Sequence, residues 1–167
     1  MHAITGIIIY DVGQYGVPLI KDDNDAKYTA ESILNEHEGL VYDWYTVGRG
    51  RFSGTYGKDV YRATDKEFFI VVDSLIDAQY RNFECARNSL GDSFDYYNAL
   101  YEHGSGNPPD YSGWYLSKYA NFINGAFTFD SHIYDSYFET SRVNKKMIED
   151  YKAHPENYYL VLFDVHN

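Results

Sequence analysis

The chain has 167 residues, of which 44% are hydrophobic, enough apolar material for one folded domain and too much for a disordered chain. Its formal net charge of −11 argues against direct binding to nucleic acid, because a phosphate backbone calls for a basic surface. Because Cys85 is the single cysteine, an internal disulfide is excluded, and a location in the reducing cytoplasm is expected. Neither a secretion signal nor a membrane-spanning segment is expected.

Short apolar runs bounded by turn residues predict the strands of a central sheet. The first run contains three consecutive isoleucines and the last run closes the sequence, and both are expected to be buried. Two runs between them are expected to form a hairpin, at 125–129 and 133–138. In chain order, strands are predicted at 3–12, 41–47, 68–72, 125–129, 133–138 and 158–165.

Capping residues and apolar periodicity predict about four helices. Asp25 is expected to cap the first helix and Gly39 to stop it. Ser74 is expected to cap the second, with Asp77 completing a capping box, and Gly91 to end it. Helices are predicted at 25–37, 74–90, 93–103 and 141–154, and 104–109 is predicted to be a loop that could serve as a mobile lid. These elements predict a single α+β domain over residues 1–167, with a mixed or antiparallel central sheet.

The most informative segment is 42–54, which combines aromatic, guanidinium and glycine residues. Aromatic rings offer faces for stacking, arginine offers a planar fork for phosphate or carboxylate, and glycine lets the backbone approach a ligand. These groups suit an anionic, nucleotide-like molecule. The candidate binding residues are Trp44, Tyr45, Gly48, Arg49, Gly50, Arg51 and Phe52. The structural alternative is an aromatic-rich turn in which Arg51 pairs with a carboxylate and Trp44 lies in the core.

A short sequence echo places an aspartate two residues before a histidine at two positions. Asp130 and His132 form the first pair, and Asp164 and His166 form the second. Residues two apart in a strand share a face, so each pair could present a carboxylate beside an imidazole. This combination suits ligand binding, or general acid–base catalysis with the carboxylate orienting the base.

Three apolar runs end on an aspartate, at Asp11, Asp73 and Asp164. If these strand ends met at one edge of the sheet, the three carboxylates could hold Mg²⁺ or Mn²⁺. The simpler interpretation is that aspartate ends a strand and caps the following segment. No complete metal, P-loop or dinucleotide-binding motif occurs, so no cofactor is expected.

The segment 44–54 resembles the W-Y-x-x-G-G-R-W-x-G signature of a family of small bacteriophage and bacterial proteins that has no established activity. Phe52 replaces the second tryptophan of the signature, and Arg49 is inserted between its glycines. Residues 128–131 loosely match a central T-P-D-G-x-W stretch, and Asp164 and His166 match a V-D-C-H-I ending. The resemblance implies a phage-related origin and the cytoplasm of a host cell.

Three functions are consistent with these features. The first is a phage protein that binds an anionic, nucleotide-like molecule, for example to sequester a second messenger of host immunity. The second is a small hydrolase or phosphodiesterase, with His166 as general base, Asp164 as its orienting acid and Arg51 as a clamp on developing charge. The third is an acidic antagonist of a host protein or a DNA mimic. The chain could also bind a second copy of itself and form a homo-oligomer.

Overall fold

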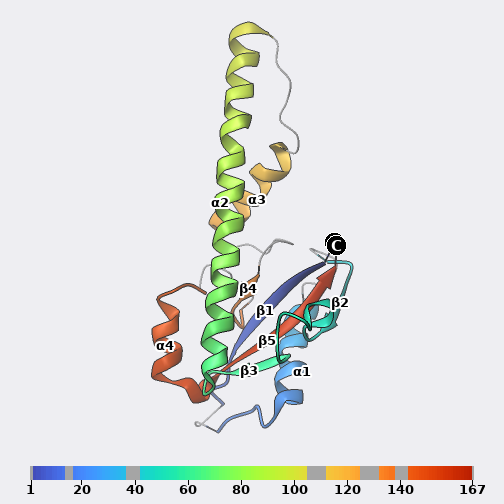
Figure 1. The fold of residues 1–167 in the computed structure, drawn as a ribbon, viewed down its shortest axis with the longest axis vertical. Helices are drawn as coiled ribbons and strands as arrows, with labels where there is room; N and C mark the ends of the chain where they lie inside the picture. Colours follow the sequence, from blue (N-terminus) through green and yellow to red (C-terminus); the bar gives the residue numbers. More distant parts are fainter. Residues whose placement is uncertain are drawn as a thin grey trace.

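Two long antiparallel strands, β1 (His2–Tyr10) and β5 (Tyr158–His166), lie side by side at the centre of the sheet (Figure 1). The structure is a computed structural model, and it describes residues 2–13, 17–36, 42–104, 112–124, 132–137 and 143–166. The register pairs His2 with His166 and Tyr10 with Tyr158, so the two strands match over their full length. Both strands were predicted from their apolar runs, and both are confirmed.

Three shorter strands complete the sheet in the described part of the chain. β2 (Trp44–Val47) and β3 (Val60–Arg62) both pair antiparallel with β5, whereas β4 (Ile133–Tyr134) pairs parallel with β1. The strand order is β2-β5-β1-β4, with β3 beside β5. The sheet is therefore mixed, and the predicted α+β class is confirmed.

Helices cover both faces of this sheet. α1 (Asp23–Asn35) buries Ala26, Ala30 and Leu34 against one face, which carries the odd-numbered residues of β5. α2 (Lys66–His103) and α4 (Met147–Ala153) pack on the other face, which carries the even-numbered residues. Each face has its own apolar core because neighbouring side chains of a strand point to opposite sides.

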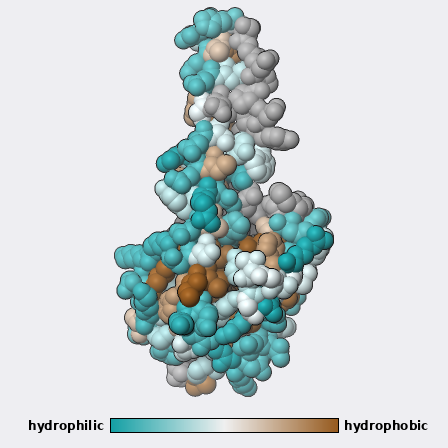
Figure 2. All heavy atoms as spheres, in the orientation of Figure 1, coloured by the Kyte–Doolittle hydropathy of each residue, from teal (hydrophilic) through white to brown (hydrophobic). Residues whose placement is uncertain are grey.

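α2 has 38 residues and extends well beyond the sheet (Figure 1). At a rise of about 1.5 Å per residue it is about 57 Å long. α3 (Ser112–Asn124) lies beside its outer part. The visible surface is largely hydrophilic, and apolar residues gather on the body that carries the sheet (Figure 2). Among the described helices, none combines the length and the apolar character that crossing a membrane requires.

The predictions for 68–103 are wrong in one respect: the whole stretch is a single helix. Phe68 and Val72 are buried while Ile70 is exposed, which is the periodicity of a helix and not of a buried strand. Ser74 and Gly91 lie inside α2 and neither caps nor ends it. A five-residue apolar run cannot distinguish a strand from a buried helical turn, and Gly91 is tolerated because its neighbours continue the helix.

The other boundaries moved by a few residues. Asp22, not Asp25, caps α1, since its side chain accepts the backbone N–H groups of Asn24 and Asp25. α4 begins at Met147, six residues after the predicted start at 141, and ends at Ala153, one residue before the predicted end ahead of Pro155. α3 was not predicted. Of the strand expected at 133–138, only Ile133 and Tyr134 form a strand, β4, which pairs with β1, and residues 135–137 do not continue it. Gly104 of the expected loop is the C-cap of α2, and the segments 105–109 and 125–129 lie outside the described residues. The extent of the single domain over 1–167 stays a prediction.

Candidate functional site

The loop between β2 and β3 is held by two carboxylates, each lying against a glycine. Gly48 has a φ of +100° and Gly50 a φ of +45°, a region that favours glycine. A Cβ built on Gly48 would lie 2.7 Å from the carboxyl carbon of Asp59, and one built on Gly50 would lie 2.6 Å from Cβ of Asp164. The fold itself therefore explains both glycines.

Arg49 is engaged within the fold. Its Nε lies 3.2 Å from Oδ1 of Asp59, and its guanidinium donates to the backbone carbonyl of Tyr56. Nζ of Lys27, from α1, lies 2.9 Å from the other oxygen of Asp59. Burial alone would raise the pKa of Asp59. The hydrogen bonds from Lys27 and from the backbone of Arg49, together with the positive charges of these two residues, have the larger effect and lower this pKa. Arg49 thus fastens the loop to the fold, and a ligand-binding role for it stays a prediction.

Arg51 differs from Arg49 because only its backbone is fixed. Its N–H donates to Oδ2 of Asp164 over 2.9 Å. Its side chain is exposed, and its guanidinium forms no ion pair with any residue in the described ranges. The structural alternative placed Arg51 against a carboxylate, and the side chain that does this is Arg49 instead. Arg51 therefore keeps its guanidinium available to an anion.

Asp164 is a carboxylate that is only 2% exposed, at the end of a strand whose other inner positions are apolar. Its Oδ1 lies 2.7 Å from Nδ1 of His2, and its Oδ2 accepts the N–H of Arg51. Ile4 is paired with Asp164 in the register, so His2 reaches the carboxylate diagonally across the two strands. Both oxygens of this buried group therefore have a donor, as its desolvation requires.

His166 has a different carboxylate partner from the one expected. Its Nδ1 lies 2.8 Å from Oδ1 of Asp43, and this hydrogen bond lowers the pKa of Asp43. The expected pair, Asp164 orienting His166, is corrected by this geometry: Asp164 orients His2. Distance alone does not decide between the two histidines, because residues two apart in a strand and diagonal neighbours on adjacent strands are both separated by about 7 Å. The partners differ instead: Asp43 engages Nδ1 of His166, and Nδ1 of His2 lies within hydrogen-bond distance of Asp164.

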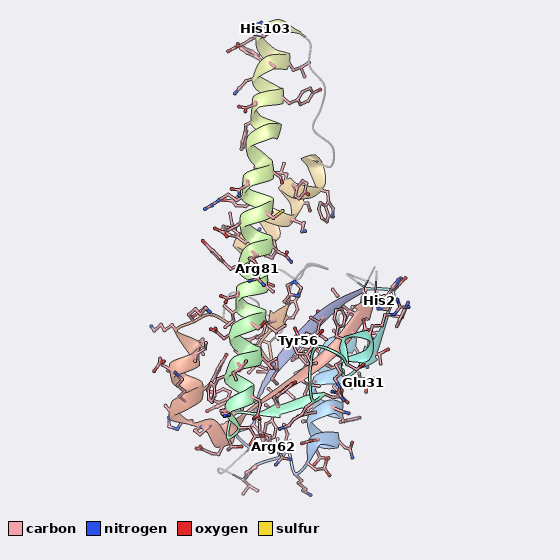
Figure 3. All side chains as sticks on the ribbon, viewed as in Figure 1. His2, Glu31, Tyr56, Arg62, Arg81 and His103 are labelled. Carbon is pink, nitrogen blue, oxygen red and sulfur yellow. The ribbon has the colours of Figure 1, made fainter. Side chains whose placement is uncertain are left out.

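Three rings gather at this end of the sheet. The indole of Trp44 stacks on the imidazole of His166, with centroids 5.0 Å apart and 15° between the planes. His2 meets Trp44 edge-on at 5.1 Å and His166 at 4.9 Å. Trp44 still keeps 44% of its surface exposed, so it does not lie in the core as the structural alternative proposed. Figure 3 shows His2 at the end of the sheet opposite to Arg62. We call the residues His2, Asp43, Trp44, Asp164 and His166 the two-histidine cluster.

Two of the aromatic candidates lie away from this cluster. Tyr45 packs on the α1 side of the sheet, and its hydroxyl lies 2.8 Å from Oε1 of Glu31 and 2.7 Å from Oδ1 of Asn35. Phe52 is half-buried against the core on the α2 side. The alternation of β2 explains the separation of Tyr45 from Trp44, because adjacent strand residues point to opposite faces. Both rings contribute to packing.

The other expected aspartate–histidine pair is described only at its histidine, since Asp130 lies outside the described residues. The ring of His132 lies between β1 and α2, with Nδ1 3.0 Å from the carbonyl oxygen of Ile4 and Nε2 3.0 Å from Nδ2 of Asn82. Its backbone N–H donates to Oε1 of Gln79 over 2.6 Å. His132 therefore joins the helix to the sheet, and its ligand-binding role stays a prediction.

The hypothesis that three strand-end carboxylates meet is wrong. Asp11 follows the end of β1 opposite to the end near Asp164, and it accepts the backbone N–H groups of Leu19 and Ile20. Asp73 lies within α2 and pairs with Lys145. No group of three His, Cys, Asp or Glu side chains suited to a metal ion occurs among the residues that the structure describes. Asp11 instead holds the segment that follows β1, Asp73 forms an ion pair, and Asp164 binds His2 and the backbone of Arg51.

Sequence reasoning missed two members of the two-histidine cluster, His2 and Asp43. His2 belongs to no motif, and Asp43 lies in the segment 42–54 but was not among the candidates. Each reaches the cluster through strand pairing, because His2 and Trp44 both lie opposite His166 in the register. The two predicted strands β1 and β5 could have indicated these residues, because an antiparallel pairing of the two strands brings His2 close to His166.

Comparisons with protein-family models, with curated proteins and with solved structures found no match. The resemblance to phage proteins and the phage origin therefore stay predictions.

Proposed function

We propose that the protein binds an anionic, nucleotide-like small molecule at the two-histidine cluster. The observation that carries this proposal is an exposed indole that is already held in place. Trp44 stacks on His166, and His166 is fixed in turn by Asp43. A ring that is ordered before binding loses little conformational freedom when a base stacks on it, so more of the stacking energy contributes to affinity.

Arg51 supports the anionic part of the proposal. Its backbone is anchored to Asp164, next to His2, and its exposed guanidinium has no ion pair among the described residues. A guanidinium binds phosphate through two parallel hydrogen bonds, and protonated imidazoles add positive charge. The net charge of −11 opposes this binding, so the local cations have to dominate the potential at the cluster. We therefore expect affinity to rise as the histidines become protonated.

The resemblance to phage proteins extends the proposal to a biological role. A small protein in the host cytoplasm that holds a nucleotide without altering it would remove a second messenger from a host immune pathway. This role requires tight binding and recovery of the intact nucleotide after the protein is denatured.

Calorimetric titration with nucleoside monophosphates, cyclic nucleotides and cyclic dinucleotides tests the proposal. We expect Trp44→Ala to weaken binding by roughly tenfold to a hundredfold, because stacking contributes about 1–3 kcal/mol per base. Trp114→Ala is a matched control, since Trp114 is 46% exposed and lies on α3. Arg51→Ala should weaken the binding of phosphate-containing ligands and leave the binding of nucleosides unchanged. Arg81→Ala, at an exposed arginine on α2, is the matched control (Figure 3). No binding of any nucleotide, or equal losses in both tryptophan variants, would overturn the proposal.

A second candidate function, hydrolysis of a nucleotide phosphodiester, is favoured by one observation. The rings of His2 and His166 lie 4.9 Å apart, and each is hydrogen-bonded to its own carboxylate. One neutral imidazole could take a proton from water while the other, protonated, gives a proton to the leaving oxygen. Product formation by catalytic amounts of protein, lost in both His2→Ala and His166→Ala, would establish this function; recovery of intact nucleotide would support sequestration.

A further inference from the structure

A tyrosine-lined cavity of about 330 Å³ opens at the other end of the same sheet face. Tyr10 and Tyr158, which line it, are paired in the register at the end of β1 and β5 farthest from His2. This volume is in the range of small-molecule pockets. Its lining includes Tyr10, Tyr151, Tyr158, Asp135 and Met147.

The rings form a connected wall. The ring centroids of Tyr10 and Tyr158 are 5.1 Å apart, and those of Tyr151 and Tyr158 are 4.7 Å apart. Tyr151 comes from α4 and is buried, so it forms the floor, whereas Tyr10 is 52% exposed and stands at the opening. Three separate elements thus bring aromatic faces to one hollow: β1, β5 and α4.

The charges around this wall are negative. Among the described residues that line the cavity, Asp135 is the one with a charged side chain. Burial raises the pKa of Tyr151, and the neighbouring Tyr158 and the charges of Asp135 and Asp150 raise it further. Burial also raises the pKa of Tyr158, followed by the effects of Tyr10 and Asp150. Asp135 lies in the lining itself, and the charge of Asp150 reaches both Tyr151 and Tyr158, so the cavity disfavours an anion and favours a cation.

We infer that this cavity binds a small organic cation bearing an alkylated ammonium group. The faces of aromatic rings attract such cations through their quadrupoles, and rings arranged as a cage recognise quaternary ammonium groups. The carboxylate of Asp135 neutralises the charge, while Met147 and the rings contact the alkyl groups. The net charge of −11, which opposes anion binding at the two-histidine cluster, attracts a cation here. The inference is independent of the proposed function, because it uses none of the same residues.

The decisive probes are choline and its neutral carbon isostere. In the isostere, a tert-butyl group replaces the trimethylammonium group. The two molecules have nearly the same shape and differ in charge. Titration of the whole protein, followed by calorimetry or by NMR of the tyrosine signals, should show binding of choline and no measurable binding of the isostere. Equal binding of both probes would show a merely apolar cavity and overturn the inference, and so would the absence of choline binding.

Variants then assign the binding to this cavity. Asp135→Asn and Tyr10→Leu should each weaken choline binding by about tenfold, while Tyr10→Phe, which keeps the ring, should bind nearly as the wild type does. Tyr28→Leu, at a tyrosine that is exposed on α1, is the matched control and should leave choline binding unchanged. Tyr10 is half-exposed, so its substitution is expected to preserve the fold, which circular dichroism verifies. Binding that is unchanged in both Asp135→Asn and Tyr10→Leu would place the cation elsewhere and overturn the inference.

Discussion

The carboxylate of Asp164 occupies the space in which a side chain on Gly50 would begin. It accepts the N–H of the next residue, Arg51, and it also binds His2 from the neighbouring strand. One buried carboxylate therefore fixes the glycine-rich loop and one histidine of the cluster at the same time. A second carboxylate fixes the loop in the same way two residues earlier, where Asp59 lies against Gly48.

The close approach at the two glycines predicts a specific loss of stability. Gly48→Ala and Gly50→Ala should each lower the free energy of unfolding by about 1–3 kcal/mol, because a Cβ meets a carboxylate and the positive φ strains any other residue. Gly54→Ala is the matched control, since nothing lies within 4 Å of its Cβ position. Urea denaturation measures all three; an equal effect at Gly54 would contradict the explanation.

Substitutions of the two arginines in the loop should have different effects on the free energy of unfolding. Arg49→Ala should lower the free energy of unfolding by about 1–2 kcal/mol, because it removes the contacts with Asp59 and Tyr56. Arg51→Ala should change it by less than about 0.5 kcal/mol, because its exposed side chain has no partner among the described residues. Thermal and chemical denaturation check both values. A stability loss in Arg51→Ala as large as that in Arg49→Ala would argue that its guanidinium is structural.

The lowered pKa of Asp59 predicts a pH-dependent stability. The carboxylate is favoured in the folded state, so its contribution is present above its usual pKa of 3.8 and is lost as the pH falls through the lower folded value. Asp59→Asn should therefore destabilise the protein by about 1–2 kcal/mol at neutral pH, and the difference from wild type should shrink as the pH falls below the usual pKa of 3.8. Denaturation curves measured across this range provide the check. A difference that is constant with pH would show that the ion pairs with Lys27 and Arg49 contribute little.

The continuity of α2 gives a test at Gly91. Because Gly91 lies inside the helix with open space around its Cβ position, Gly91→Ala should raise the free energy of unfolding by about 0.5–1 kcal/mol. If Gly91 ended a helix in a left-handed conformation, as the sequence suggested, the same change would lower it. Chemical denaturation distinguishes the two signs directly, and circular dichroism should show helix content that is retained or increased.

The sequence by itself was sufficient for β1, β5, α1 and the end of α4. These elements rest on local features: continuous apolar runs, helical periodicity with a capping aspartate, and a proline. The sequence also located the segment around Trp44 and Arg51 as the candidate site, because aromatic, guanidinium and glycine residues seldom occur together without a structural or functional reason.

The tertiary structure decided everything that depends on contacts between distant segments. Phe68 to Val72 became part of a helix because α2 buries one side of that run against the sheet and leaves Ile70 exposed. Asp164 binds His2, 162 residues away, because the antiparallel pairing of β1 and β5 places His2 diagonally across from it, whereas the carboxylate found on Nδ1 of His166 is that of Asp43. Arg49 and Arg51 are two residues apart and chemically identical, but Asp59 lies within reach of the Arg49 guanidinium, whereas the guanidinium of Arg51 forms no ion pair among the described residues.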